Sequence, residues 1–443
     1  MESKKKEYGL LTSIAMIIGI VIGSGIFFKS DNILIATGGS IYLGVLVFFI
    51  AALGIIFGGL TIGELASRDS RAGGIITYTE NAYSESFACS FGWFHTFVYF
   101  PSLIAVISWV AGVYICILFG IEGSLLLQCL IGLGIATLLY LINICSKFLG
   151  GFFQNASTII KIIPLLLIAI SGVIFGNTQS ISVNNFMDAD SISWIAAIAP
   201  IAFSLDGWII STSIAHEIKD SKKNLPKALI IAPIFIVLIY VLYFVGISIY
   251  VGPEQIMALG DAHVDIAANG IFGPLGGKII ITFVVISIIG TLNGLILGYI
   301  RMPYSLAIRN MIPNSKGIGV INEKFSVSIK SAVLSYIISL IWLLVHYITQ
   351  KYNLMPNGDV SEISIVVNYL LYILLYFKVF KMGLEGEVKG IWRGKVNPIL
   401  ATLGSIITLV GSFSNPLLIL YLLISFSVLI IAFIYHKNVV KND

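Results

Sequence analysis

The chain has 443 residues, of which 58% are hydrophobic and only 11% are charged. Soluble globular proteins carry about 25% charged residues, so this composition excludes a large water-soluble domain and indicates a protein embedded in a membrane. The formal net charge of +4 is small for this length, and it gives no reason to expect a nucleic-acid partner.

Apolar stretches long enough to cross a bilayer recur along the whole chain. A membrane-spanning helix needs about 20 predominantly apolar residues, and twelve stretches meet this requirement. They cover residues 10–36, 41–65, 87–118, 124–144, 152–175, 194–213, 228–250, 278–306, 329–349, 362–380, 397–413 and 416–435. The sequence therefore predicts an all-α polytopic membrane protein that forms a single transmembrane domain over residues 1–435.

The basic residues are distributed unequally between the two sides of these spans. Of the 26 lysines and arginines, 22 fall in connections on the side of the N-terminus; Lys29, Lys278 and Lys351 fall on the other side, and Lys161 lies within a span. Cytoplasmic connections carry such an excess. Both termini, including a tail over residues 436–443, are therefore predicted to lie in the cytoplasm, with the protein in the cell membrane in contact with lipid.

The first span is interrupted by glycines near its middle. The candidate binding residues here are Ile22, Gly23, Ser24, Gly25 and Ile26. In lipid, unwound backbone is tolerated only where it lines a protein cavity, and the N–H groups that begin the outer half-helix would suit a carboxylate. The alternative is helix packing, because Gly19 and Gly23 form a Gly-x-x-x-Gly motif. The first interruption alone does not decide between the two.

A polar segment follows the second span on the predicted cytoplasmic side. Glu64 and Arg68 are candidates for an inner gate that makes and breaks ion pairs, with Glu217 as a third member after the sixth span. The alternative is that they are a helix end and interfacial anchors. The connection over residues 66–86 is too apolar in its middle for a solvated loop, so it is predicted to be re-entrant or to lie on the membrane surface.

Lys161 lies in the middle of the fifth span, too deep to reach the interface easily. Its ammonium can occupy the place of a sodium ion at the carbonyls of an unwound helix, which would make transport independent of sodium. It could instead carry a proton or form a fixed salt bridge to Asp206. We favour a tie between spans one, five and eight.

The second interruption lies in the sixth span and contains an aspartate. Its candidate binding residues are Phe203, Ser204, Leu205, Asp206, Gly207 and Trp208. A carboxylate at the bilayer centre costs about 2.5–3.5 kcal/mol, so Asp206 should face a cavity or a partner. The carbonyls of residues 203–205 could accept bonds from an ammonium group, Trp208 could line the pocket, and Phe203 could cover it. Alternatively, Asp206 only bonds the frayed backbone.

The two interruptions fall at matching places in two sets of five spans. Sets of five have opposite orientation, which predicts an inverted repeat with the binding site at the two breaks. The first repeat covers about residues 8–175 and the second residues 194–380, and residues 397–435 form two further helices. No clustered cysteines or histidines suggest a metal, a cofactor or an enzyme, and no rings of polar groups suggest a channel.

These motifs, taken together and in this order, resemble the amino acid–polyamine–organocation superfamily, and within it the L-amino-acid transporter group with its bacterial serine/threonine and alanine/serine/cysteine exchangers. The resemblance rests on residues 19–27, 63–66, 73–74, 158–164, 203–208, 217–220, 224–228, 293–294 and 301. It implies a bacterial protein with the leucine-transporter-type fold of five plus five helices. It also implies that a substrate carboxylate binds the backbone of residues 24–26 and that Lys161 supports sodium-independent exchange.

The expected function is sodium-independent exchange of small neutral L-amino acids by alternating access. The alternative is a proton-coupled symporter, or a uniporter, of neutral or cationic amino acids. Animal members of the group bind a single-span glycoprotein through a cysteine after the third span. Residues 120–123 contain no cysteine, so no such partner is expected.

Overall fold

The computed structural model describes residues 9–442 except residues 24, 70, 72, 146, 177–192 and 357, and in a few helical segments it describes the backbone alone. The secondary structure of these residues is helical, with one isolated β-bridge between Asn322 and Val327. Eleven helices are long and apolar enough to cross a membrane, or twelve if the bent pair at the start of the chain is one span. The predicted fold class is confirmed.

The first half of the chain begins with a helix pair separated by a short break. Its helices are α1 (Leu10–Val21), α2 (Gly25–Ala36), α3 (Ile41–Arg68), α4 (Ile75–Ala82), α5 (Glu85–Phe94), α6 (Phe100–Phe119), α7 (Leu125–Cys145) and α8 (Lys147–Phe175). A π-helical turn, η1 (His95–Tyr99), joins α5 to α6. The connection predicted over residues 66–86 contains the short helix α4, whose first five residues are buried.

The second half also begins with an interrupted helix. Its α-helices are α9 (Ile198–Leu205), α10 (Ser221–Val251), α11 (Pro253–Leu259), α12 (His263–Ala307), α13 (Ser315–Ile318), α14 (Ile329–Lys351), α15 (Val360–Leu384), α16 (Asn397–Gly411) and α17 (Leu418–Asn442). It also contains short helices of other types, namely the 3₁₀ helices η5 (Trp208–Glu217) and η6 (Gly260–Ala262) and the π-helical turn η7 (Trp392–Val396). Residues 436–442, predicted as a tail, continue α17.

Local sequence signals explain several helix boundaries. Ser40 and Ser84 precede α3 and α5, and their hydroxyls accept hydrogen bonds from the N–H groups of Leu43 (3.3 Å) and Phe87 (3.4 Å), as N-cap residues do. Gly120 follows α6 with φ of 64°, the left-handed conformation that commonly ends a helix.

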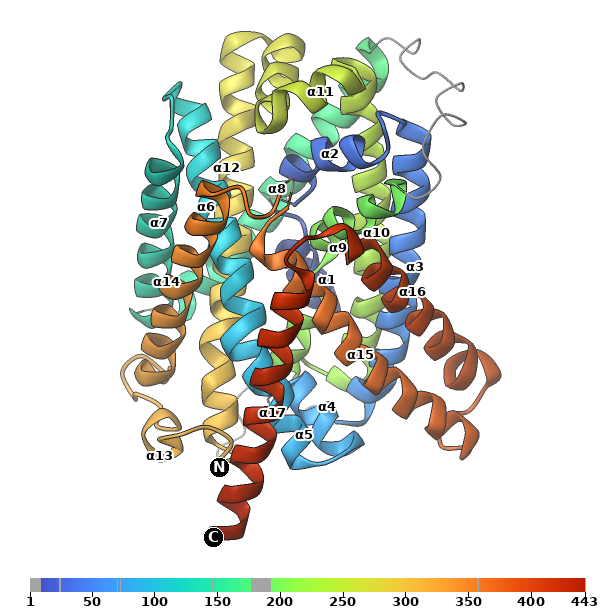
Figure 1. Cartoon of the computed structure of the whole chain (residues 1–443), viewed down its shortest axis with the longest axis vertical. Coiled ribbons are helices and arrows are strands. Elements are labelled where there is room, and N and C mark those ends of the chain that lie inside the picture. The colour runs from blue at the N-terminus through green and yellow to red at the C-terminus, as the bar shows by residue number, and fades with distance from the viewer. Residues whose placement is uncertain are drawn as a thin grey trace.

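The two interrupted spans lie at the centre of the bundle. Within the span Trp194–Thr212, 89% of the most apolar window is buried, against 22% within Leu418–Val439. α1 packs on α8, α10 and α12, and α2 packs on α9. α7, α14, α16 and α17 lie around this centre (Figure 1) and expose apolar side chains such as Leu138 and Ile430. Lipid is the solvent that suits such a surface.

The long helices run between two ends of the bundle. One end carries α11 and the outer part of α2, and we call it the α11 end (Figure 1). The opposite end carries α4, α5, α13 and the last turns of α17, and we call it the α13 end. The two helix breaks lie between these ends, so a molecule bound at the breaks would be separated from both membrane surfaces.

Candidate functional site

The first break separates α1 from α2. Ile22 has extended backbone angles (φ −71°, ψ 106°), and the two half-helices meet at an angle of 50°. A Cβ atom on Gly23 would overlap Thr291 of α12, and a Cβ on Gly25 would lie 2.6 Å from the Cα of Ser204. Glycine is therefore required at both positions because other elements approach the backbone too closely for a side chain.

The second break follows α9. Asp206 is extended (ψ 168°), Gly207 has φ of 93°, and the chain then continues as the 3₁₀ helix η5. The positive φ favours glycine. Since Gly25 packs directly on Ser204, the two predicted breaks meet in space. Ser24, the central residue of the predicted carboxylate site, lies outside the described residues.

A small cavity lies where the breaks meet. Its volume is about 20 Å³, room for about one water molecule. It is lined by Ile20, Val21, Gly25, Leu103, Ile107, Phe203, Asp206, Gly207, Thr291 and Leu295. An amino acid is larger than this space, so the surrounding helices must separate before one can bind.

Lys161 of α8 lies beside the end of α1. Its side chain is fully buried, and its ammonium donates hydrogen bonds to the carbonyl oxygen of Gly19 and to the hydroxyl of Thr291 (2.9 Å). The Thr291 hydroxyl donates in turn to the carbonyl of Ile22 (3.1 Å). These contacts join spans one, five and eight, the arrangement favoured above, whereas the described contacts of Lys161 do not include Asp206.

The environment of Lys161 has a simple electrostatic cause. The last four carbonyls of a helix lack partners within it, and the helix dipole makes that end negative. At the end of α1, Lys161, Thr291 and Tyr240 supply the missing donors; the Tyr240 hydroxyl bonds the carbonyl of Val21 (2.9 Å). A fixed ammonium therefore stabilises the interruption of α1.

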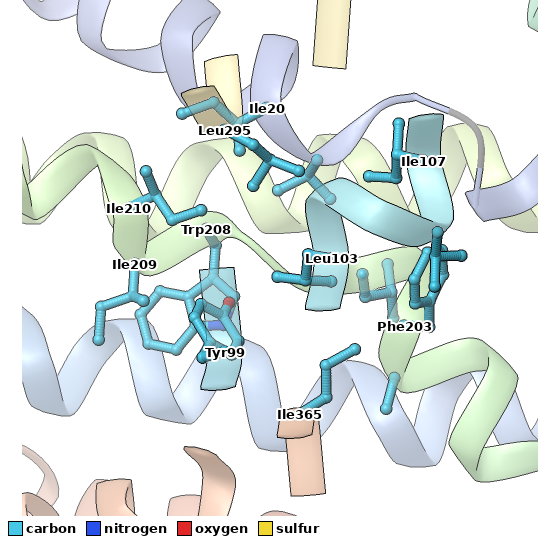
Figure 2. Close-up of a cluster of buried hydrophobic side chains, with 14 of the residues drawn as sticks. Ile20, Tyr99, Leu103, Ile107, Phe203, Trp208, Ile209, Ile210, Leu295 and Ile365 are labelled. Atoms are coloured by element: carbon cyan, nitrogen blue, oxygen red, sulfur yellow. The ribbon is translucent and has the colours of Figure 1, made fainter. Parts of the chain in front are cut away.

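Asp206 bonds a tyrosine of the third span. The hydroxyl of Tyr99, in η1, donates to Asp206 Oδ2, whereas Asp206 Oδ1 is buried without a hydrogen-bond partner among the described residues. Trp208 points away from the cavity and packs on Tyr372 of α15, with ring centroids 5.8 Å apart. Figure 2 shows the buried hydrophobic side chains around the breaks, with Phe203 and Ile107 on one side of the cluster and Trp208 and Tyr99 on the other. The structure thus places Trp208 outside the cavity lining.

A second cavity lies on the other side of the bond between Tyr99 and Asp206. It also has a volume of about 20 Å³. Its lining consists of Gly73, Ile75, His95, Tyr99, Phe100, Ile209, Ile210, Thr212 and Met302. Since Gly73 belongs to the connection before α4, this cavity lies on the side of the breaks that faces the α13 end.

A buried group of three charges lies between α2 and the start of α15. Lys29 Nζ lies 2.9 Å from Asp359 Oδ2 and 2.5 Å from Glu362 Oε1. The three residues are 1%, 2% and 6% exposed. The ammonium also lies 5.1 Å from the ring centroid of Phe28 and 5.3 Å from that of Phe203. We call Lys29, Asp359 and Glu362 the outer triad. Lys29, counted above among the basic residues on the side opposite the N-terminus, is thus buried inside the protein with its carboxylate partners.

Charged residues also connect elements at the α13 end. Glu64 accepts hydrogen bonds from Arg68 (3.1 Å) and from Arg393 of η7 (2.6 Å). Arg393 is largely exposed, and exposed pairs contribute at most about 1 kcal/mol. The backbone of Glu217 is described within η5, but its side chain lies outside the described part of the chain.

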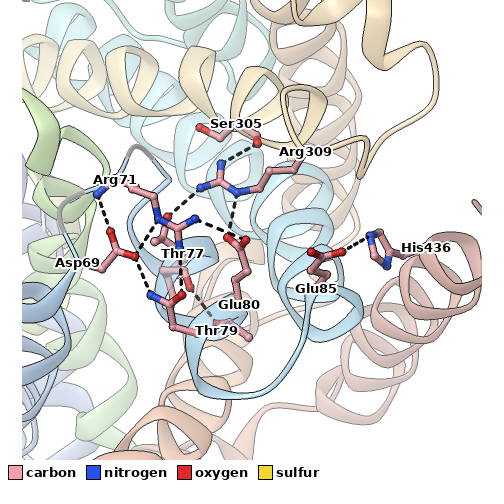
Figure 3. A network of polar contacts seen from close by, with 11 residues as sticks. Asp69, Arg71, Thr77, Thr79, Glu80, Glu85, Ser305, Arg309 and His436 are labelled. Atoms are coloured by element: carbon pink, nitrogen blue, oxygen red, sulfur yellow. Dashed lines mark hydrogen bonds and ion pairs between the residues drawn. The ribbon is translucent and has the colours of Figure 1, made fainter. Parts of the chain in front are cut away.

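A second network of polar contacts joins α4 to the end of α12 (Figure 3). Arg309, just after α12, donates to Glu80 (3.2 Å) and Thr77 (3.0 Å) of α4. Asp69 accepts hydrogen bonds from the backbone (2.9 Å) and side chain (2.8 Å) of Arg71. These contacts join the connection after span two, α4 and the end of span eight that lies at the α13 end.

The electrostatics of Asp69 favour its ionised form. Burial raises the pKa of this carboxyl. Hydrogen bonds from the Arg71 N–H and from the side chains of Asn81 and Arg71, together with the charge of Arg71, lower the pKa by more than burial raises it. The net effect is a pKa below the ordinary 3.8. The Asp69 contacts are therefore present at neutral pH and are lost only in strong acid.

Several of these residues were not predicted as site residues. Tyr99 is an aromatic residue in an apolar span, and nothing in its local sequence separates it from packing residues. For the outer triad a signal did exist: Lys29 falls inside the predicted first span, Asp359 lies just before the predicted tenth span, and Glu362 is the first residue of that span. Charges at membrane depth usually pair with one another, so these three could have been matched.

The sequence is similar to known membrane transport proteins over most of its length. The family model described as amino acid permease matches residues 8–438, including the last third, which the motifs above do not cover. The serine/threonine exchanger SteT of Bacillus subtilis (strain 168) is 30% identical over 410 residues, covering 92% of this chain and 90% of SteT. The b(0,+)-type amino acid transporter 1 of Mus musculus is 28% identical, over 66% of this chain and 61% of that protein.

A solved structure has the same overall fold. MhsT, crystallised in complex with L-phenylalanine, aligns with a TM-score of 0.64 at 14% identity, covering 93% of this chain and 100% of the MhsT chain. At this identity the likeness supports the leucine-transporter-type fold and not a shared substrate.

Proposed function

Because the chain belongs to the amino acid permease family, whose members transport amino acids across membranes, we propose that it exchanges small neutral L-amino acids by alternating access without sodium. The N-terminus and the α13 end lie in the cytoplasm under this proposal, as the distribution of basic residues favours. The protein works without a glycoprotein partner. The observation that carries the proposal is the contact between the Lys161 ammonium and the end of α1.

Lys161 supports independence from sodium. In transporters with broken helices, the C-terminal ends of half-helices and unwound carbonyls coordinate Na⁺. Here that end of α1 meets the Lys161 ammonium, and Thr291 bonds the carbonyl of Ile22. A lysine is covalently held and cannot be released on one side of the membrane. The ammonium therefore stays at the site throughout the cycle, and transport draws no driving force from a sodium gradient.

The broken backbone supports exchange over uniport. Each buried polar group without a partner costs about 1–3 kcal/mol, and lipid offers no water to satisfy it. A substrate carboxylate at the N–H groups that begin α2, and an ammonium at the carbonyls that end α9, would satisfy these groups while the protein changes sides. An empty transporter would leave them unpaired, so it would change sides more slowly than a loaded one.

The contacts on either side of the cavity suggest how access alternates. Toward the α11 end, the outer triad and Phe203 close the space above the breaks. Toward the α13 end, the bond between Tyr99 and Asp206 separates the two cavities. We propose that separation of α2 from α15 admits an amino acid from outside. Separation of Tyr99 from Asp206, together with opening of the Arg309 network, releases it inside.

The cavity lining favours a small neutral substrate. Apart from Asp206, its side chains are apolar or, in Thr291, a hydroxyl. The SteT relative, named as a serine/threonine exchanger, fits the same size range. The second candidate function is proton-coupled or uniport transport of neutral or cationic amino acids. The free oxygen of Asp206 favours it, because a carboxylate in the lining could pair with a cationic side chain.

The test is uptake of a labelled amino-acid panel into proteoliposomes in sodium-free buffer. Empty vesicles are compared with vesicles preloaded with the same unlabelled amino acid. Uptake of serine, threonine or alanine into preloaded vesicles, at least tenfold faster than into empty ones, supports exchange. Equal uptake into both would overturn exchange, and acceleration of that uptake by an inward proton gradient would establish the proton-coupled alternative.

A further inference from the structure

The outer triad contains one more negative group than positive group. Its ammonium belongs to Lys29 of α2, and its two carboxylates belong to Asp359 and Glu362 at the start of α15. All three side chains are almost completely buried. A buried carboxylate without its own cation is strongly disfavoured, and binding a proton removes its charge.

The surroundings do not supply the missing positive charge. Two further carboxyls lie beside the triad, and the positive or titratable groups that favour their ionised forms are Lys29 itself and, for Asp31, a histidine. The groups that interact electrostatically with the triad, or with each other beside it, are Asp31 of α2, Tyr114 of α6, Asp261 of η6, His263 of α12, His346 of α14 and Tyr421 of α17. His346 is buried, and neither of its ring nitrogens has a hydrogen-bond partner among the described residues. It therefore gives no sign of carrying a charge.

Hydrogen bonding separates the two carboxylates of the triad. Asp359 is the N-cap of α15, and its Oδ1 accepts from the N–H (2.9 Å) and the hydroxyl of Ser361. Donors of this kind stabilise an ionised carboxylate, whereas the positive end of the helix dipole acts on both carboxylates, because Glu362 lies in the first turn of the same helix. Glu362 accepts from Lys29, the ammonium that it shares with Asp359. A single proton in the triad therefore belongs on Glu362.

The triad is coupled to the cavity through an aromatic ring. Phe203 lies 5.3 Å from the Lys29 ammonium and also lines the cavity at the breaks. Phe28 meets it edge-to-face, with ring centroids 5.4 Å apart. Separation of α2 from α15 would move these rings and admit water to both the triad and the cavity. In water each carboxylate is solvated, and Glu362 no longer needs its proton.

We propose that Glu362 is a proton-binding site that closes the α11 end of the protein. It takes a proton from the outer solution when α2 and α15 close, and it returns that proton to the outer solution when they separate. The triad stays closed while the α13 end is open, so no proton is delivered to the cytoplasm. This inference rests on the proposed alternating access. External pH thus controls opening, without proton transport.

The test measures opening directly and does not require transport. Ile107 lines the cavity, so Ile107→Cys reports whether the α11 end is open. It is placed in a Cys145→Ala background, because Cys145 is the exposed one of the four cysteines. The full-length protein in liposomes is treated from outside with a membrane-impermeant thiol reagent between pH 6 and pH 8. The background without Ile107→Cys serves as the labelling control.

Glu362→Gln mimics the protonated side chain, and Glu385→Gln is the matched control at the far, exposed end of α15. Each labelling rate is divided by the rate in Glu362→Gln at the same pH, which cancels the thiol's own titration. Binding of one proton changes the opening equilibrium up to tenfold per pH unit. The ratio should rise at least fivefold from pH 6 to pH 8 in the parent and in Glu385→Gln. A flat ratio would overturn the proposal.

A second variant keeps the idea testable if Glu362→Gln does not fold. Asp359→Asn leaves one carboxylate for one ammonium, so it should abolish the pH dependence as well. Retention of the parent profile in Asp359→Asn would overturn the role of the surplus charge. Changing only the internal pH should leave labelling unchanged, and proton uptake into the vesicles during amino acid exchange would contradict return of the proton to the outside. A chain that labels as expected but transports nothing would refute only the proposed function.

Discussion

Replacing Lys161 should nearly abolish transport without preventing the protein from folding. The side chain is fully buried and donates two hydrogen bonds, to the Gly19 carbonyl and to Thr291. Hydrogen bonds that involve a charged group contribute about 1.5–3 kcal/mol each. Loss of both should therefore destabilise the arrangement of the first break by at least about 3 kcal/mol, which corresponds to about a hundredfold decrease in the rate of exchange.

The assay is the initial rate of amino acid exchange in proteoliposomes, normalised to the amount of reconstituted protein. Lys161→Ala removes the ammonium and the stem, whereas Lys161→Met keeps an apolar stem of similar length. Both should fall about a hundredfold, because the ammonium carries the effect. Lys278→Ala, at an exposed lysine, is the control and should keep the parent rate. A Lys161→Met rate within about threefold of the parent, with normal protein levels, would refute the reasoning.

Three further changes test other parts of the site. Gly25→Ala places a Cβ 2.6 Å from backbone of α9, so exchange should fall more than tenfold, whereas Gly9→Ala meets no atom within 4 Å and should behave as the parent. Asp206→Asn should weaken competition by lysine or arginine at least tenfold and competition by serine less than threefold. If competition by cationic amino acids relative to serine were unchanged, the carboxylate would serve only to hold Tyr99. Since the pKa of Asp69 lies below 3.8, its contacts are lost only as the pH falls through that lower value, and exchange should not respond to internal pH between 5 and 8 through this residue.

The fold was accessible from the sequence because lipid imposes strict rules on a membrane-spanning chain. Apolar length predicts the spans, and the excess of basic residues on one side favours one orientation of the spans in the membrane. The two breaks were visible for the same reason, because glycines and an aspartate at membrane depth need a structural explanation. The structure brings Gly25 and Ser204 into direct contact, as the inverted repeat requires.

The partners of these residues were less accessible. Lys161 could be matched to spans one and eight because a central lysine needs carbonyl or hydroxyl partners. The bond between Tyr99 and Asp206 depends on the rotation of the third span about its axis at the π-helical turn η1. A shift of one residue along a helix changes whether a tyrosine faces the site or the lipid. Trp208 is the opposite case. It follows the break directly, yet the 3₁₀ helix η5 turns it toward Tyr372 and away from the cavity.

Efflux under sodium-free conditions tests the central claim most directly. Proteoliposomes are loaded with labelled serine in choline buffer, and efflux is followed before and after unlabelled serine is added outside. Exchange at a site where Lys161 occupies the place of a sodium ion predicts little efflux at first and a rise of at least tenfold on addition, with the same rates when sodium replaces choline. Rapid efflux before the addition, or a requirement for sodium, would contradict the account.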